Sequence, residues 1–230
     1  TTINGSGGAD GLLRNIDQND PRQGGLGLNS VEYSTFPLGD SSGATRTNDC
    51  NYSRIPSPDD SSIRDSVAYA PHIAEGIDQD ARNEFFCLSQ NTGGGQDVLL
   101  PTTAIIHAVG ITPADINAIA VEQASVIWSP RTNIDLYGHT AHATLMARSG
   151  VRLALGTDWV VSGSMNMLRE LQCVDSLNRN NYGSYFSDRE IVDMATKNGA
   201  EALGAGTKLG TLATGYEADI SIFRRNGKKS

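Results

Sequence analysis

Three predicted strands of this chain end in a side chain that can bind a metal ion or move a proton. These side chains are His72 in VAYAPHIAEG, His107 in AIIHAVG and Asp158 in LALGTDW. A carboxylate at the end of an apolar strand is costly to bury unless a charged partner meets it there. In a parallel α/β barrel all strand C-termini open on one face, which would bring the three side chains around one cavity. Imidazole and carboxylate are ligands of catalytic zinc or iron.

Each of these residues also has an ordinary structural interpretation. A single histidine at a strand end is more often a hydrogen-bonded core or rim residue, and an aspartate there is often the N-cap of the next helix. Asp158 lies several residues before the helix predicted near Met165, which weakens the capping interpretation. The occurrence of three such residues at strand ends favours a shared site.

Glu75 follows His72 by three residues, at the mouth of the same predicted strand. A carboxylate beside a metal-bound water can shuttle protons, because the metal lowers the pKa of that water to roughly 7. The spacing alone leaves a solvated loop glutamate as an equal alternative. The position of Glu75 beside His72 adds to the case for a shared site, with Glu75 as its proton shuttle.

Other aromatic and imidazole side chains lie where they could border the cavity. Trp128, Tyr137 and Trp159 are near strand ends and could stack on a flat substrate, although packing at the rim explains each of them as well. His139 and His142 lie three residues apart at a helix start, without an H-E-x-x-H pattern or a nearby third ligand. We expect them to be exposed, with His139 able to border the cavity as a substrate-binding residue.

The second half of the chain alternates short apolar runs with helical patterns, which is typical of parallel βαβ units. Strands are predicted at residues 104–107, 125–128 and 151–155, and helices at 112–123, 140–149, 165–177 and 188–203. The first half adds strands at 1–4, 29–36 and 67–72, separated by the long polar loops 5–25 and 37–63. Six strands fit an open doubly wound sheet, or an eight-stranded barrel of which two strands are missing.

The charge of the chain argues against two classes of partner. A net charge of −8 and a pI of about 4.9 do not favour binding to nucleic acid or to an anionic membrane through bulk charge. No apolar run approaches the ~20 residues of a membrane-spanning helix. The first residues, TTINGSGG, lack the pattern of a signal peptide, so localisation is undetermined and the cytoplasm is the default expectation.

The three cysteines, Cys50, Cys87 and Cys173, form no C-x-x-C pair, which argues against a thiolate zinc site. We expect three free thiols, with Cys173 inside a helix. A disulfide between Cys50 and Cys87 is the alternative if the protein is exported.

Several segments, in order along residues 65–225, resemble the amidohydrolase superfamily, in particular the branch of cytosine and guanine deaminases and triazine chlorohydrolases. PHIAEG is similar to the H-x-x-E strand end of that family, and VRLALGTDW to its G-T-D strand end. IIHAVGITPADINAIA, VIWSPRTNIDLYG and MATKNGAEALG with LGTLATGYEADISIF resemble the segments that accompany them. The resemblance covers the C-terminal portion of the family's sequence.

The resemblance implies a (β/α)₈ TIM-type barrel with one divalent metal, zinc rather than iron. By motif position, His72 and Asp158 would be metal ligands, and His107 would orient the attacking water or the substrate. Glu75 would be the proton shuttle of the deaminase branch, and Asp158 would also take a proton from the water. The lysines lie away from strand ends, which favours one metal over two.

The chain departs from the family at its start, because it contains no H-x-H pair. We expect two further metal ligands upstream of Thr1 and a barrel that is incomplete at its N-terminus. The predicted division is a barrel over residues 1–205 and the beginning of a small β-sandwich portion over 206–230. We expect a homo-oligomer, or a second chain fragment that completes the barrel.

The leading functional hypothesis is a metal-dependent hydrolase of C–N bonds other than peptide bonds, which deaminates a heterocyclic or nucleobase-like small molecule. The alternatives are dechlorination or amide and amidine hydrolysis at the same site, and a non-catalytic binding protein on the same scaffold. The residues do not identify the leaving group, although a nearby Glu75 favours an amine, which must be protonated to leave.

Overall fold

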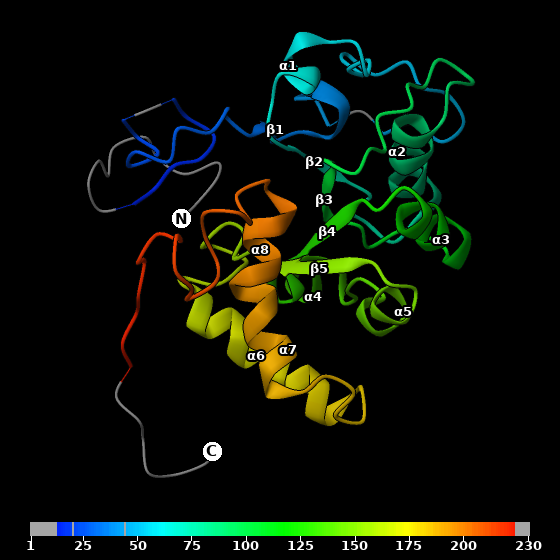
Figure 1. Ribbon diagram of the computed structural model, residues 1–230. Helices are drawn as coiled ribbons and strands as arrows, with labels where there is room; N and C mark the ends of the chain where they lie inside the picture. The colour runs from blue at the N-terminus through cyan, green and yellow to red at the C-terminus, as the bar shows by residue number, and fades with distance from the viewer. Residues whose placement is uncertain (1–12, 20, 44, 224–230) are drawn as a thin grey trace.

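Five parallel strands form the central sheet of the computed structural model, which describes residues 13–19, 21–43 and 45–223 (Figure 1). The strands lie side by side in chain order, each hydrogen-bonded to the next, so every crossover joins neighbouring strands. They are β1 (Glu32–Ser34), β2 (Tyr69–Ile73), β3 (Ala104–His107), β4 (Ser125–Trp128) and β5 (Arg152–Leu155). Parallel strands in this order present all their C-terminal ends at one edge of the sheet.

Helices follow the strands and begin where the sequence provides caps. The Thr112 hydroxyl and the Asp115 carboxylate form a reciprocal capping box at the start of α3, and Asp78 caps α2. The helices are α1 (Ser61–Arg64), α2 (Gln79–Ser89), α3 (Pro113–Val121), α4 (Pro130–Tyr137), α5 (Ala143–Arg148), α6 (Met167–Asn180), α7 (Asp188–Ala195) and α8 (Lys197–Ala202), with a short 3₁₀ turn, η1 (Pro37–Gly39). None of them, within the described ranges, is long and apolar enough to cross a bilayer.

Alternate residues of the strands pack into two separate apolar clusters. Ile105, Val126 and Leu153 join the larger cluster, together with buried side chains of α2, α3 and α5. Their neighbours Ile106 and Ile127 point to the opposite face and pack with residues of α8. Figure 1 shows the same arrangement, with α2, α3 and α5 along one side of the sheet and α8 against the other. Burial on both faces explains why these strands are continuous apolar runs.

The strand predictions agree closely with the structure, whereas several helices differ. Strands 104–107 and 125–128 are found with the predicted bounds, and the strand predicted at 29–36 is reduced to Glu32–Ser34. The strand predicted at 1–4 lies outside the described residues. The single helix predicted at 188–203 is divided into α7 and α8 at Thr196, whose backbone is not helical (φ −126°, ψ −89°). Helices α2 and α4 were not predicted.

The prediction of three free thiols is wrong for two of them, because Cys50 and Cys87 form a disulfide. Cys87 is on α2 and Cys50 is in the long loop before α1, and both are buried. Cys173 on α6 is free and partly buried. The spacing of 37 residues gave no indication of this pairing, because a contact between a loop and a helix has no sequence period.

Residues 206–223 follow the last helix without forming a strand. Within this segment the Glu217 amide donates to the Lys208 carbonyl. Arg14 also forms ion pairs with the carboxylates of Glu217 and Asp219, at 3.1 and 2.7 Å. Residues 224–230 lie outside the described part of the chain. The predicted division at residue 205 therefore stays a prediction.

Candidate active site

The side chains of Glu75, His107 and Asp158 meet at the C-terminal edge of the sheet. One ligand atom from each lies within 4.8 Å of the other two. His107 Nε2 is 3.3 Å from Glu75 Oε2 and 3.9 Å from Asp158 Oδ2. The His72 ring, at the end of β2, lies 5.1 Å from the His107 ring, centroid to centroid. The four residues predicted to form one site therefore come together from the ends of β2, β3 and β5.

The backbone is strained at the strand ends that carry these side chains. Ala74, His107, Ala108 and Asp158 all have positive φ, between 51° and 78°, a region that residues with a Cβ rarely occupy. Such conformations persist only where the surroundings hold them, and they are concentrated at functional sites. They turn each chain sharply as it leaves the sheet.

His72 is prepared to act as a ligand through its second nitrogen. Its Nδ1 lies 2.6 Å from the carbonyl oxygen of Ser34 at the end of β1, so that Nδ1 carries the proton and donates it there. This contact leaves Nε2 deprotonated, the form in which imidazole binds metals. Burial lowers the pKa of His72, while the negative charge of Asp158 opposes that shift. A neutral imidazole at this position suits a metal ligand.

His107 is fully buried, and only one nitrogen of its ring has a hydrogen-bond partner among the described residues. Asn133 Nδ2 lies 3.1 Å from Nδ1, whereas Nε2 has no hydrogen-bond partner of acceptable geometry among the described residues. Burial, and then the neighbouring His72, lower the pKa of His107 to about 3. The ring is therefore neutral at physiological pH, and its contact with Glu75 is not an ion pair. An unpartnered buried nitrogen facing two carboxylates is a group held ready for a ligand.

Glu75 is held from two sides. The Tyr137 hydroxyl donates to its Oε1 at 3.2 Å. Its backbone turn is held by Glu84 of α2, whose Oε2 accepts a hydrogen bond from the Ala74 amide at 2.7 Å. Burial raises the pKa of Glu75 to about 7, the Asp158 charge adds to the increase and the Tyr137 hydrogen bond reduces it. A carboxyl group with a pKa near neutrality can both take up and deliver a proton.

Helix α4 supplies two contacts to the site that sequence reasoning missed. Asn133 and Tyr137 are four residues apart, so they lie on one face of the helix, where Asn133 contacts His107 and Tyr137 contacts Glu75. The i, i+4 spacing is present in SPRTNIDLYG, but it carried no meaning because no helix was predicted over these residues. Pro130 is in fact the first residue of the helix.

The residues predicted to contact substrate differ in their exposure and in their distance from the site. Trp159 directly follows Asp158 and is 67% exposed, so its ring is open to a ligand. Trp128 is fully buried, packs against Tyr182 and donates its indole N–H to Thr140, which argues against the predicted stacking role. His139 is exposed and pairs edge-on with His142 at 5.7 Å. This contact does not connect it to the four site residues.

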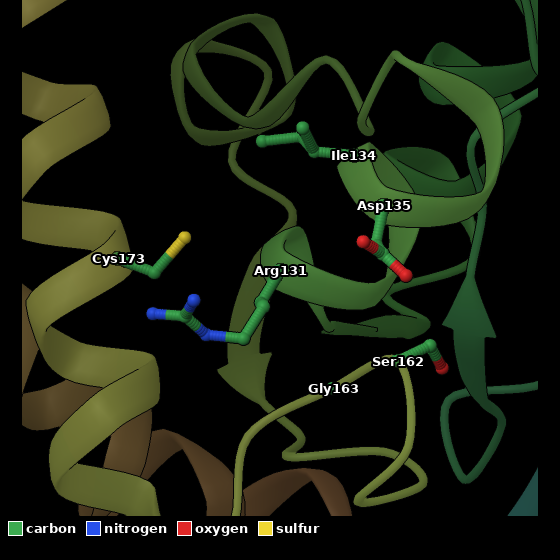
Figure 2. A pocket seen from close by; sticks show the side chains of 6 residues that line it. All are labelled: Arg131, Ile134, Asp135, Ser162, Gly163 and Cys173. Carbon is green, nitrogen blue, oxygen red and sulfur yellow. The ribbon is translucent and has the colours of Figure 1, made fainter.

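A hollow of about 310 Å³ lies on the other side of α4 (Figure 2). Arg131 and Asp135 line it, with Ser162 and Gly163 of the loop after β5 and Cys173 of α6. These α4 positions are two residues away from Asn133 and Tyr137, so they project in nearly the opposite direction. None of the four site residues lines this hollow, and Arg131 is engaged with Ser164 and the Arg169 carbonyl.

The donor set fits part of a site for a divalent metal. His72 offers a free imidazole nitrogen and Asp158 a carboxylate, and the orphaned Nε2 of His107 lies beside them. Catalytic zinc sites use three protein ligands or more, so His72 and Asp158 form an incomplete set. The chain has two other histidines, His139 and His142, and no H-x-H pair.

One curated relative and two solved structures illustrate what the chain is similar to. The 5-methylthioadenosine/S-adenosylhomocysteine deaminase of Teredinibacter turnerae is 33% identical over 132 residues, which are 56% of this chain and 30% of the relative. A zinc-bound adenosine deaminase from Xanthomonas campestris superposes with a TM-score of 0.55 at 24% identity, over 66% of this chain and 36% of that one. A zinc complex of atrazine chlorohydrolase from Arthrobacter aurescens superposes with a TM-score of 0.54 at 21% identity, over 69% of this chain and 36% of that one.

These structural similarities establish an α/β fold of the incomplete-barrel type, in which the described residues provide five adjacent parallel strands. The chain spans less than a third of the length of the curated relative named above. The model of the amidohydrolase family matches residues 70–228, which include all four residues of the site. The chain belongs to the amidohydrolase family.

Proposed function

We propose that this chain carries part of the catalytic site of a metal-dependent deaminase that hydrolyses a C–N bond in a nucleobase-like heterocycle. The observation that carries the proposal is the position of Glu75. It lies 3.3 Å from His107 and within the same 4.8 Å cluster as Asp158, and its pKa is raised to about 7. Removal of an amine needs a group that can deliver a proton at neutral pH, and Glu75 meets that need.

The relatives support this class of reaction. The curated relative is named as a deaminase of 5-methylthioadenosine and S-adenosylhomocysteine, and one of the structural neighbours is named as an adenosine deaminase. A substrate with a flat heterocycle follows from these names, and the open ring of Trp159 beside Asp158 could stack on it.

The positions of the residues support the following roles. His72 Nε2 and the Asp158 carboxylate would hold one divalent ion, zinc rather than iron, with two more ligands from outside this chain. When bound, such an ion supplies Lewis acidity, which lowers the pKa of a water molecule to about 7. Asp158 accepts a proton from the attacking water, and His107 faces the same space through Nε2. Glu75 protonates a ring nitrogen or the leaving amine, so that a C–O bond forms as the C–N bond breaks and ammonia departs.

Dechlorination is the second candidate, because a structural neighbour is an atrazine chlorohydrolase. Chloride leaves without a proton, so that reaction makes less use of a carboxyl group with a pKa of about 7. A non-catalytic binding protein is the third. It has no use for four metal-binding or acid–base side chains gathered at one edge of the sheet, two of which, His107 and Asp158, sit on strained backbone.

The test is ammonia release from a panel of purine nucleosides and bases by the full-length protein that includes the two further metal ligands, together with its metal content by plasma mass spectrometry. We expect about one zinc per chain. Glu75→Gln should lower kcat by ~10²-fold or more, the scale of general acid–base catalysis. Glu122→Gln, which changes an exposed carboxyl group at the end of α3, is the matched control and should not change kcat.

Three results would each contradict the proposal. A folded protein without metal and without ammonia release would support the binding-protein alternative. Chloride release from a chlorinated triazine without deamination would support the second candidate. Ammonia release that survives Glu75→Gln would remove Glu75 from the reaction.

A further inference from the structure

A chain of hydrogen bonds leads from the core to His107. Trp128 Nε1 lies 2.7 Å from Thr140 Oγ1, and Thr140 Oγ1 lies 3.4 Å from Asn133 Oδ1. Asn133 Nδ2 then lies 3.1 Å from His107 Nδ1. Trp128, Asn133 and His107 are fully buried, so bulk water does not compete for these groups. We call Trp128, Thr140 and Asn133 the relay.

The Asn133 amide has its oxygen toward Thr140 and its nitrogen toward His107, and this orientation gives the relay one direction. An indole N–H can only donate, so Thr140 Oγ1 must accept from Trp128. The single proton of the Thr140 hydroxyl is then left to donate to Asn133 Oδ1. An amide whose oxygen faces Thr140 presents its NH₂ to His107, so Nδ1 of the imidazole must accept. A neutral imidazole that accepts at Nδ1 carries its proton on Nε2.

The opposite side of the ring supports the same tautomer independently. Nε2 faces the Glu75 and Asp158 carboxylates at 3.3 and 3.9 Å. A bare Nε2 would direct its lone pair toward two groups that are negative when ionised, whereas an N–H there is attracted to them. Two separate observations, the orientation of the Asn133 amide and the paired carboxylates, therefore select the same nitrogen.

We propose that Trp128, Thr140 and Asn133 are positioning residues that fix His107 as the Nε2–H tautomer, so that His107 serves the reaction as a hydrogen-bond donor and not as a base. The inference rests on the proposed function only for its effect on catalysis, because the tautomer itself is a property of the folded chain. The donor points at the space between Glu75 and Asp158, where oxygen of the attacking water or of the tetrahedral adduct would lie. Trp128 therefore acts through His107 instead of contacting substrate.

The first test is the nitrogen spectrum of the metal-loaded protein labelled with ring-¹⁵N histidine. The chain has four histidines, and His107→Gln identifies the His107 signals by their loss. The proposal requires a protonated, pyrrole-type Nε2 and a bare, pyridine-type Nδ1. The reverse assignment in the unaltered protein would overturn it.

The second test breaks the relay at its middle. Thr140→Val keeps the shape of the side chain and removes the hydroxyl, and Thr144→Val is the matched control four residues further along the chain. We expect a mixture of His107 tautomers and a kcat about tenfold lower in Thr140→Val, with KM little changed, which is the scale of one lost hydrogen bond. Asn133→Asp presents an acceptor to Nδ1, so it should move the proton to Nδ1 and lower kcat by ~10²-fold or more.

The outcomes separate the relay from the proposed function. An Nε2–H signal that persists unchanged in both Thr140→Val and Asn133→Asp would overturn the relay, even if ammonia release is found. A tautomer that responds as expected in a protein without deaminase activity would support the relay and contradict the proposed function. Thr144→Val should leave both the spectrum and kcat unchanged.

Discussion

At the scale of single residues, Glu75 and Glu84 are two buried carboxyl groups with similar pKa values and different tasks. Burial raises the pKa of each to about 7. Glu75 faces His107, whereas Glu84 accepts a hydrogen bond from the Ala74 amide and so holds the turn that carries Glu75. The raised pKa of Glu75 suits the proposed proton transfer. The raised pKa of Glu84 has no such use, and it lowers the stability of the fold once the group must ionise.

The cost at Glu84 predicts how stability changes with pH. Its pKa of about 7 in the folded protein exceeds the ordinary value of 4.5, so its contribution is complete below about pH 4.5 and is lost as pH rises through 7. Glu84→Gln keeps an acceptor for the Ala74 amide and removes the titration. We expect the variant to match the wild type near pH 4.5 and to be up to about 3 kcal/mol more stable at pH 8.

Urea unfolding at several pH values measures this difference. Glu122→Gln, on an exposed carboxyl, should reproduce the wild-type profile. A Glu84→Gln profile parallel to that of the wild type would show that Glu84 does not titrate in this range.

The two histidines of the site should differ in what their loss removes. His72 has Nε2 free for a metal, whereas His107 is tied to Asn133 and faces the carboxylates. We expect His72→Gln to lose both bound metal and activity, and His107→Gln to keep most of the metal and lose activity. Plasma mass spectrometry of the purified variants decides the matter, because metal loss in His107→Gln would make His107 a ligand.

At the scale of elements, α4 connects the strand ends to one another. It begins directly after β4, and on one of its faces Asn133 contacts the last residue of β3 while Tyr137 contacts a residue that follows β2. Its opposite face lines the hollow in Figure 2, where Arg131 contacts Ser164. A short helix thereby contacts both side chains, Glu75 and His107, that are proposed to be catalytic without binding metal.

The face of α4 can be tested through Tyr137. Tyr137→Phe keeps the ring and removes the hydrogen bond to Glu75 Oε1. A hydrogen bond to a charged group contributes about 1.5–3 kcal/mol, so we expect kcat to fall by roughly 10- to 100-fold with little change in KM. Tyr216→Phe, far along the chain from α4, is a control that should not change either constant. Equal kcat in Tyr137→Phe and wild type would mean that Glu75 is held without this contact.

The strands were predictable from sequence because burial on both faces leaves an uninterrupted apolar run, as in AIIH and SVIW. The polar residues after them were predictable for the same reason, since an imidazole or carboxylate stands out where an apolar run stops. Helix α4 was not predictable in this way, because its polar face points toward the site and so disrupts the usual amphipathic pattern. Glu84 was missed because its partner is a backbone amide, which no sequence pattern records.

At the scale of the whole molecule, the long loop before α1 is fastened to α2 at three points. Cys50 is bonded to Cys87, Asn83 Nδ2 donates to the Asp49 carbonyl at 2.8 Å, and the Thr47 hydroxyl donates to Asp80 at 2.6 Å. The same helix carries Glu84, which holds the turn of Glu75. The disulfide therefore supports the site from a distance, and disulfides of this kind persist in oxidising compartments.

Loss of the disulfide should lower the stability of the folded protein without changing which residues form the site. Joining two cysteines 37 residues apart is worth about 4 kcal/mol in the chain-entropy description, so we expect the Cys50→Ser, Cys87→Ser double variant to lose about that much stability. Reductant should lower the Tm of the wild type toward that of the double variant and leave the double variant unchanged. Cys173→Ser should respond to reductant as the wild type does, because Cys173 is free. Thiol counting on the denatured, unreduced protein provides the decisive check. We expect one reactive thiol, that of Cys173, whereas three would show that Cys50 and Cys87 are not bonded and that the disulfide does not fasten the loop to α2.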